Sequence, residues 1–90
     1  MEAEQLDGRL IQTKAQLHST LKLVLGLDDH YGGNLDALYD VLTTKRETLT
    51  ITHGRQLSEH LGSYATSVQR VLSDAAVANP DFHYEWREGR

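Results

Sequence analysis

Several residue types are absent or scarce in this 90-residue chain. It has no cysteine, which excludes disulfide bonds, thiolate metal ligands and a thiol nucleophile. No stretch approaches the roughly 20 apolar residues of a membrane span, and the N-terminus lacks the basic region and apolar run of a secretion signal. We therefore expect a cytoplasmic protein without a membrane partner. The length and the 39% hydrophobic content indicate one globular domain, residues 1–90.

Basic residues are also missing from one segment. Between Gly26 and Thr44 there is no lysine or arginine, whereas the segment holds four of the acids, Asp28, Asp29, Asp36 and Asp40. The rest of the chain has nine acids and nine bases, so the whole net charge of −4 lies in this segment. A local negative field repels nucleic acid and attracts a basic partner. Direct binding of nucleic acid is therefore disfavoured.

The stretch His30 to Asp40, HYGGNLDALYD, is the candidate site. Asn34 is a good N-cap after the flexible Gly32-Gly33, and helical periodicity follows. One face of this helix is apolar and is expected to hold it to a core: Leu35, Leu38 and Leu42. The other face presents two carboxylates, an aromatic ring and a hydroxyl: Asp36, Tyr39, Asp40 and Thr43. The helix dipole can explain an acid in the first turn, but it gives no reason for Asp40, for which a solvated surface position is the ordinary alternative.

The hydrophobic periodicity predicts seven elements. Strands are expected at residues 2–6, ended by a turn at Asp7-Gly8, at 48–52 and at 82–86. Helices are expected after a capping box at 13–16, after the Asn34 cap, at 53–61 and after a Ser63 cap, the last one ending at Asn79-Pro80. Strands separated by helices favour an α/β fold with a three-stranded parallel sheet packed with about four helices, in the order β-α-α-β-α-α-β.

Catalytic and metal chemistry find little support. The five histidines are scattered, with no pair at i, i+4 and no HExxH pattern, so no metal site is expected. Asp36 and Asp40 could form an acid–base pair, but both lie on an outward face, so an enzyme is disfavoured. Gly32-Gly33 lacks the phosphate-loop pattern, and no cofactor is predicted. The alternating aromatics near the C-terminus are interpreted as core: Phe82, Tyr84 and Trp86.

The stretch Leu17 to Thr43, LHSTLKLVLGLDDHYGGNLDALYDVLT, resembles the barstar family of intracellular ribonuclease inhibitors. The resemblance is carried by LH.TLK, YG.NLDAL and D.LT, and it continues more loosely through Arg55-Gln56 and Ser67-Val68 to the last strand. It implies a parallel three-stranded sheet, and a second helix that plugs the active site of a basic, extracellular-type, barnase-like ribonuclease together with the preceding loop. The resemblance gives Asp40 the place of a substrate phosphate and implies a role in toxin–antitoxin immunity.

The resemblance also extends the set of predicted partner-binding residues. Together with the periodicity it gives His30, Tyr31, Gly32, Asn34, Asp36, Tyr39, Asp40, Thr43 and Asp74. Tyr39 stands where the family has tryptophan, His30 where it has tyrosine, Asp74 where it has glutamate, and Lys45-Arg46 replaces an apolar pair. These departures leave two interpretations open, an inhibitor adjusted to another ribonuclease or a barstar-like interaction module whose partner is not a ribonuclease. In either case we expect a monomer when no partner is bound.

Overall fold

Three short strands form one parallel sheet with β2 in the middle, and helices connect the strands. The computed structural model describes residues 3–89. The elements in chain order are β1 (Ala3–Asp7), the 3-10 helix η1 (Gly8–Leu10), α1 (Lys14–Val24), α2 (Leu35–Leu42), β2 (Glu47–Thr52), α3 (Gly54–Leu61), α4 (Ser63–Ala78) and β3 (Phe82–Trp86). The predicted fold class and element order are confirmed.

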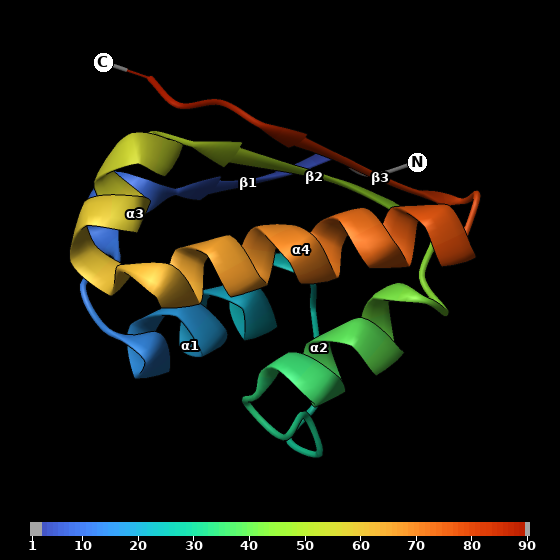
Figure 1. The fold of residues 1–90 in the computed structure, drawn as a ribbon. Helices are drawn as coiled ribbons and strands as arrows, with labels where there is room; N and C mark the ends of the chain where they lie inside the picture. The colour runs from blue at the N-terminus through green and yellow to red at the C-terminus, as the bar shows by residue number, and fades with distance from the viewer. Residues whose placement is uncertain (1–2, 90) are drawn as a thin grey trace.

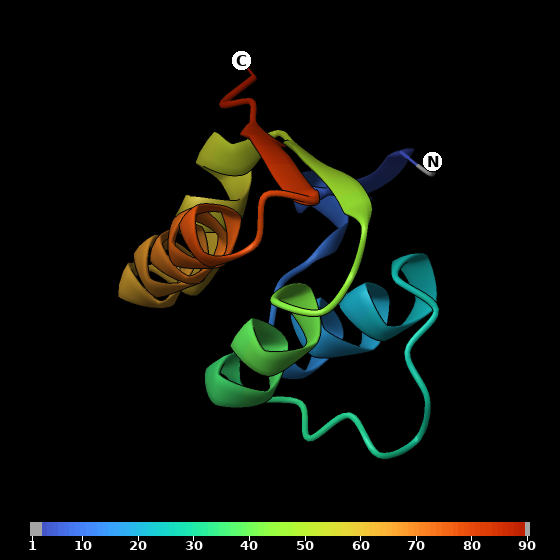
Figure 2. The ribbon, with the colours of Figure 1, turned by 90° about the vertical axis from the view of Figure 1, so that its right-hand side faces the viewer.

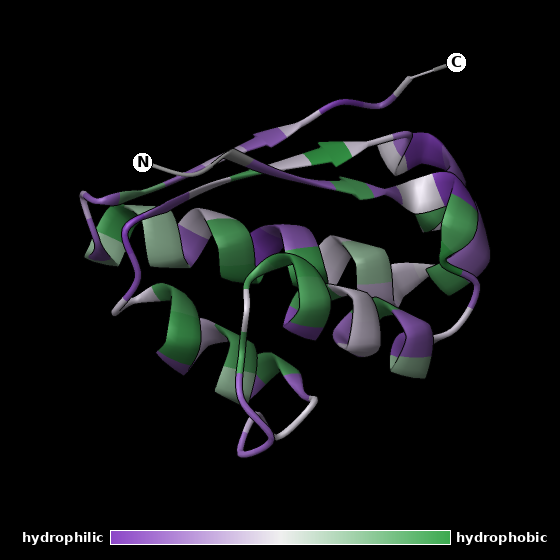
Figure 3. Ribbon diagram, turned by 180° about the vertical axis from the view of Figure 1, so that it is seen from behind, coloured by the Kyte–Doolittle hydropathy of each residue, from purple (hydrophilic) through white to green (hydrophobic). Residues whose placement is uncertain are grey.

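Helices α1, α2 and α4 lie on one side of the sheet, and α3 lies at one end of it (Figure 1). The same arrangement is seen from behind, where the strands run above the helical layer (Figure 3). Leu6, Ile51 and Trp86 are register partners across the three strands and point toward the helices. Long crossover connections are what a parallel sheet requires, and here each crossover contains two α-helices.

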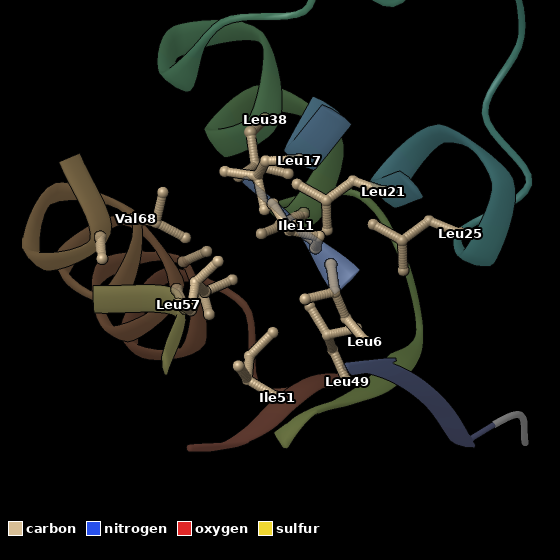
Figure 4. Packing of buried hydrophobic residues seen from close by; sticks show 14 of the residues in the cluster. Leu6, Ile11, Leu17, Leu21, Leu25, Leu38, Leu49, Ile51, Leu57 and Val68 are labelled. Atoms are coloured by element: carbon tan, nitrogen blue, oxygen red, sulfur yellow. The ribbon is translucent and has the colours of Figure 1, made fainter. Parts of the chain in front are cut away.

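Leucine dominates the core between the sheet and the helices (Figure 4). The fully buried side chains come from every layer, and the largest are Phe82, Leu6, Ile11, Leu17, Leu21, Leu38, Leu42, Leu49, Ile51, Leu57, Leu72 and Val68. The predicted aromatic stripe packs against this core unevenly, because Phe82 is buried whereas Tyr84 and Trp86 are half-buried. Leu35, predicted as an anchor of α2, is also only half-buried.

The first strand differs from its predicted bounds. Glu2 lies outside the described residues, and β1 continues through Asp7. The predicted turn therefore begins one residue late, as the 3-10 helix η1. The Asp7 carboxylate accepts a hydrogen bond from the Arg9 backbone N–H at 2.9 Å and so caps η1. β2 begins one residue earlier than predicted, at Glu47.

Two predicted helix starts need correction. Ser63 was predicted as a cap, but it is the first residue of α4, and the N-cap is Gly62, which makes no side-chain cap hydrogen bond. Gly62 is both the C-cap of α3 and the N-cap of α4, with φ 60°, because a one-residue connection needs a left-handed conformation that glycine adopts without strain. His53, predicted inside a helix, is the N-cap of α3 with φ 54°.

The predicted capping box at the start of α1 is half correct. Thr13 Oγ1 accepts a hydrogen bond from the Gln16 N–H at 3.1 Å, as expected. Gln16 Oε1, however, accepts from the N–H of Gln12 at 2.7 Å, one residue before the predicted donor. The reciprocal hydrogen bond therefore satisfies the backbone N–H of Gln12, the residue just before the N-cap.

Asn79 ends α4 as predicted and also joins two distant connections. Its buried amide donates to the carbonyl oxygens of Leu42 at 2.9 Å and Lys45 at 2.8 Å, and its Oδ1 accepts from the Asp81 N–H at 3.0 Å. The carbonyl of Leu42 belongs to the last turn of α2. One side chain therefore positions the C-terminal end of α2 against the end of α4.

We expect Asn79→Ala to lower the free energy of unfolding by about 2–3 kcal/mol, because it leaves the buried Leu42 carbonyl and the part-buried Lys45 carbonyl without this donor. Urea denaturation measures the change. Ser63→Ala is the matched control in the same helix and should leave stability within about 0.5 kcal/mol, since the Ser63 side chain makes no cap. Equal stabilities of the two variants would contradict the assigned role of Asn79.

Candidate functional site

The connection between α1 and α2 projects from the helical layer (Figure 2). A groove lies between this loop and α2. The groove has a volume of about 450 Å³. It is lined by Gly26, Leu27, Asp28, His30, Tyr31, Gly32, Ala37, Asp40, Val41, Thr44 and Lys45. Four of the predicted site residues are therefore brought together around one feature: His30, Tyr31, Gly32 and Asp40.

The burial of α2 explains which of its residues reach the groove. Leu38 and Leu42 are fully buried and hold the helix to the core. The groove is then lined by positions i, i+3, i+4 and i+7 of one helical face: Ala37, Asp40, Val41 and Thr44. This face differs from the predicted polar face, with which it shares only Asp40.

The other predicted α2 residues lie outside the lining of the groove. Asp36 is exposed in the first turn. Tyr39 is half-buried and packs against the core. Thr43 is the C-cap of α2, and its hydroxyl donates to the Asp40 carbonyl oxygen at 2.9 Å. Asn34 is the N-cap, as predicted, and accepts from the Ala37 N–H at 2.8 Å.

The four clustered acids fall into two kinds. Asp29 forms an ion pair with Lys22 at 2.7 Å, and this lysine lowers the pKa of Asp29. Asp28 Oδ1 accepts from the His30 N–H at 2.9 Å, which shapes the loop. By contrast, the exposed carboxylates of Asp36 and Asp40 make no hydrogen bond or ion pair with any residue in the range 3–89. These two carboxylates are free to meet an external cation.

A buried histidine fixes the loop to the body of the protein. His18 in α1 is 6% exposed, and its Nδ1 lies 2.6 Å from the Tyr31 hydroxyl and its Nε2 2.7 Å from the Tyr64 hydroxyl. A neutral imidazole can accept from one phenol and donate to the other. The two hydrogen bonds join the loop, α1 and α4, and we call the three side chains of Tyr31, His18 and Tyr64 the tether.

Burial favours the uncharged form of all three groups of this tether. It lowers the pKa of His18, because the charged imidazolium would lose its hydration. Burial, with a smaller contribution from Tyr64, raises the pKa of Tyr31 to about 12. It also raises the pKa of Tyr64. The tether therefore consists of neutral hydrogen bonds.

Sequence reasoning missed this tether, because it took the histidines as surface or partly packed residues. A signal was present: His18 follows Leu17 and precedes Leu21 by three residues, so it shares the buried face of α1. The phenol partners could not be found in this way, since Tyr31 and Tyr64 lie 13 and 46 residues away along the chain.

Asp74 is placed elsewhere. It is exposed on α4 and lines a second groove of about 340 Å³. The other residues of that groove are Thr66, Gln69, Arg70, Ser73 and Tyr84, none of which lines the groove beside α2. Asp74 therefore lies apart from the predicted site residues that line the groove beside α2.

Within residues 3–89, no group of three or more histidine, aspartate or glutamate side chains is arranged to hold a metal ion. In the same range no helix has both the length and the apolar composition needed to cross a membrane.

Asp40 lines the groove and Asp36 does not, so the two carboxylates do not share a pocket.

These features define an α/β fold in which α2, with two exposed and unpaired aspartates, and a tethered loop lie beside an open groove. The family model described as Barstar (barnase inhibitor) matches residues 1–86, so the chain belongs to the barstar family. The family description names an inhibitor, not an enzyme. A relative from Bacillus subtilis (strain 168), named "Putative ribonuclease inhibitor YrdF", is 40% identical over 73 residues, which cover 78% of this chain and 80% of the relative. The family resemblance predicted from the sequence is confirmed.

The tether predicts a pH dependence of stability. His18 has a pKa below its usual value of 6.5 when folded, so below about pH 6.5 the unfolded chain binds a proton that the folded chain does not. The unfolding free energy should therefore decrease as the pH falls from about 6.5, by up to about 1.4 kcal/mol per pH unit from this residue. Urea denaturation from pH 8 down to pH 5 should show this decrease, and His18→Gln should show a smaller one. Parallel pH profiles for the two proteins would refute the role of His18.

Proposed function

We propose that this protein is a cytoplasmic inhibitor of a barnase-like ribonuclease and plugs the basic active site with α2 and the preceding loop. Membership of the barstar family and the relative named as a ribonuclease inhibitor support an inhibitory role. The concentration of the net charge in residues 26–44 supports a basic partner, because opposite charges raise the encounter rate. An immunity role, protecting the cell from a ribonuclease toxin, would follow from such inhibition.

The observation that carries this proposal is the state of Asp40. Its carboxylate is exposed at the groove, has no partner among the described residues and lies beyond the first turn, where the helix dipole gives little stabilisation. An unpaired carboxylate on a rigid helix can take the place of a substrate phosphate among cationic side chains. In the proposed complex, Asp40 is this phosphate mimic.

The other residues have supporting parts in the proposed complex. Asp36 and Tyr39 flank Asp40 on α2, while His30, Tyr31 and Gly32 supply the loop side of the contact. Asn34 holds the start of α2 through its cap, and Thr43 holds the end. Asp74 makes a peripheral contact from α4. The tether from Tyr31 to His18 supports this arrangement, since an ordered loop loses less conformational entropy on binding.

Inhibition of a purified barnase-like ribonuclease tests the proposal. We expect Asp40→Ala to lose about 2–5 kcal/mol of binding free energy, because it leaves the partner's cations without a counter-charge. Asp29→Ala is the matched control, since Asp29 is already paired with Lys22 and does not line the groove. If the Asp40 variant inhibits as well as the wild type, the mechanism is wrong. If the wild type inhibits no such ribonuclease but captures another basic protein, the chain is an interaction module of a different kind.

Ionic strength gives a second test. An interface that depends on acidic residues 26–44 should associate more slowly as salt increases, because screening weakens the long-range attraction. Association and dissociation rates measured by surface plasmon resonance at low and high salt would separate this effect from changes in dissociation. An association rate that does not change with salt would count against the acidic surface.

A further inference from the structure

Lys45 is the residue with a permanent positive charge among those that line the groove beside α2. It follows the C-terminus of α2 and is half-buried. Asp40 lines the same groove and carries the opposite charge. The acidic segment identified in the sequence ends at Thr44, one residue before this lysine.

The helix end does not require the Lys45 ammonium group. A cation near a helix C-terminus commonly satisfies the last carbonyl groups. Here the final four carbonyl oxygens of α2 already accept hydrogen bonds, from Thr43 N at 3.0 Å, Thr43 Oγ1 at 2.9 Å, Thr44 N and Oγ1 at 3.1 and 2.9 Å, and Asn79 Nδ2 at 2.9 Å. Capping therefore gives no reason for a lysine at this position.

Nor does a local ion pair account for Lys45. Its neighbour Arg46 lies 3.8 Å from the Asp81 carboxylate, and Lys22 pairs with Asp29 at 2.7 Å. Lys45 has no such carboxylate partner among residues 3–89. Two unpaired charges of opposite sign, Asp40 and Lys45, thus line one groove.

We propose that Lys45 determines specificity by pairing with a carboxylate that the partner presents beside its cationic side chains. This inference rests on the proposed function and adds to it a requirement on the partner. A partner surface of positive charge alone would attract Asp40 and be repelled by Lys45. A surface with both signs satisfies both residues, and a site that cleaves RNA by acid–base chemistry can include a carboxylate for proton transfer.

Binding to a barnase-type ribonuclease measured by isothermal titration calorimetry tests the inference. Lys45→Gln should weaken binding about tenfold, because it leaves the partner carboxylate without its counter-charge. Arg46→Gln is the matched control on the next residue and should change the affinity less than about twofold, since Arg46 faces Asp81 and does not line the groove. Unchanged or tighter binding by the Lys45 variant would overturn the inference.

A double-mutant cycle then identifies the partner group. Each acidic residue of the ribonuclease surface that faces the inhibitor is replaced by its amide. One such replacement should weaken binding of the wild type about tenfold and have no effect on Lys45→Gln. If no replacement couples to Lys45 while Asp40→Ala still abolishes inhibition, the proposed function stands and the role of Lys45 is wrong. If the wild type binds no ribonuclease, both proposals fall together.

Discussion

The hydrogen bonds on either side of the His18 ring are the interaction on which the arrangement of the site depends. One buried imidazole holds a loop hydroxyl at 2.6 Å and a hydroxyl of α4 at 2.7 Å. The loop has few apolar side chains to anchor it otherwise, and its charged residues face solvent. Without the tether, the loop wall of the groove would have to be ordered by the partner at the cost of conformational entropy. Through these two hydrogen bonds the candidate site is joined to α1 and α4.

Hydrogen bonds from a second side chain, Asn79, hold the C-terminal end of α2. Asn79 satisfies the carbonyl oxygens of Leu42 and Lys45 from within the body of the protein. The helix is therefore fixed by leucines along its buried face, by Asn34 at its start and by Asn79 near its end. A carboxylate on such a helix can be placed against a partner with little loss of side-chain and backbone freedom, which favours tight binding.

Some charged side chains of this protein form ion pairs within the chain, and others have no partner among the described residues. Asp29 and Arg46 have partners in the same chain, whereas Asp36, Asp40 and Lys45 have none among the described residues. The sequence shows that the net negative charge lies in residues 26–44, but it does not show which of these acids form ion pairs in the folded protein. That separation matters for function, because an ion already paired at the surface contributes little to binding a partner.

The sequence by itself determined the fold class, the order of the elements and the buried faces, because one-sided burial leaves a period of two in strands and of about 3.6 in helices. It also supplied the caps at Thr13 and Asn34 and, through LH.TLK and YG.NLDAL, the family. Only the tertiary structure decided that His18 binds two tyrosines, that Lys45 joins Asp40 at one groove and that Asp74 lies at another. Periodicity tells which face of an element is buried, but the contacts between residues distant in the chain depend on how the elements pack in three dimensions.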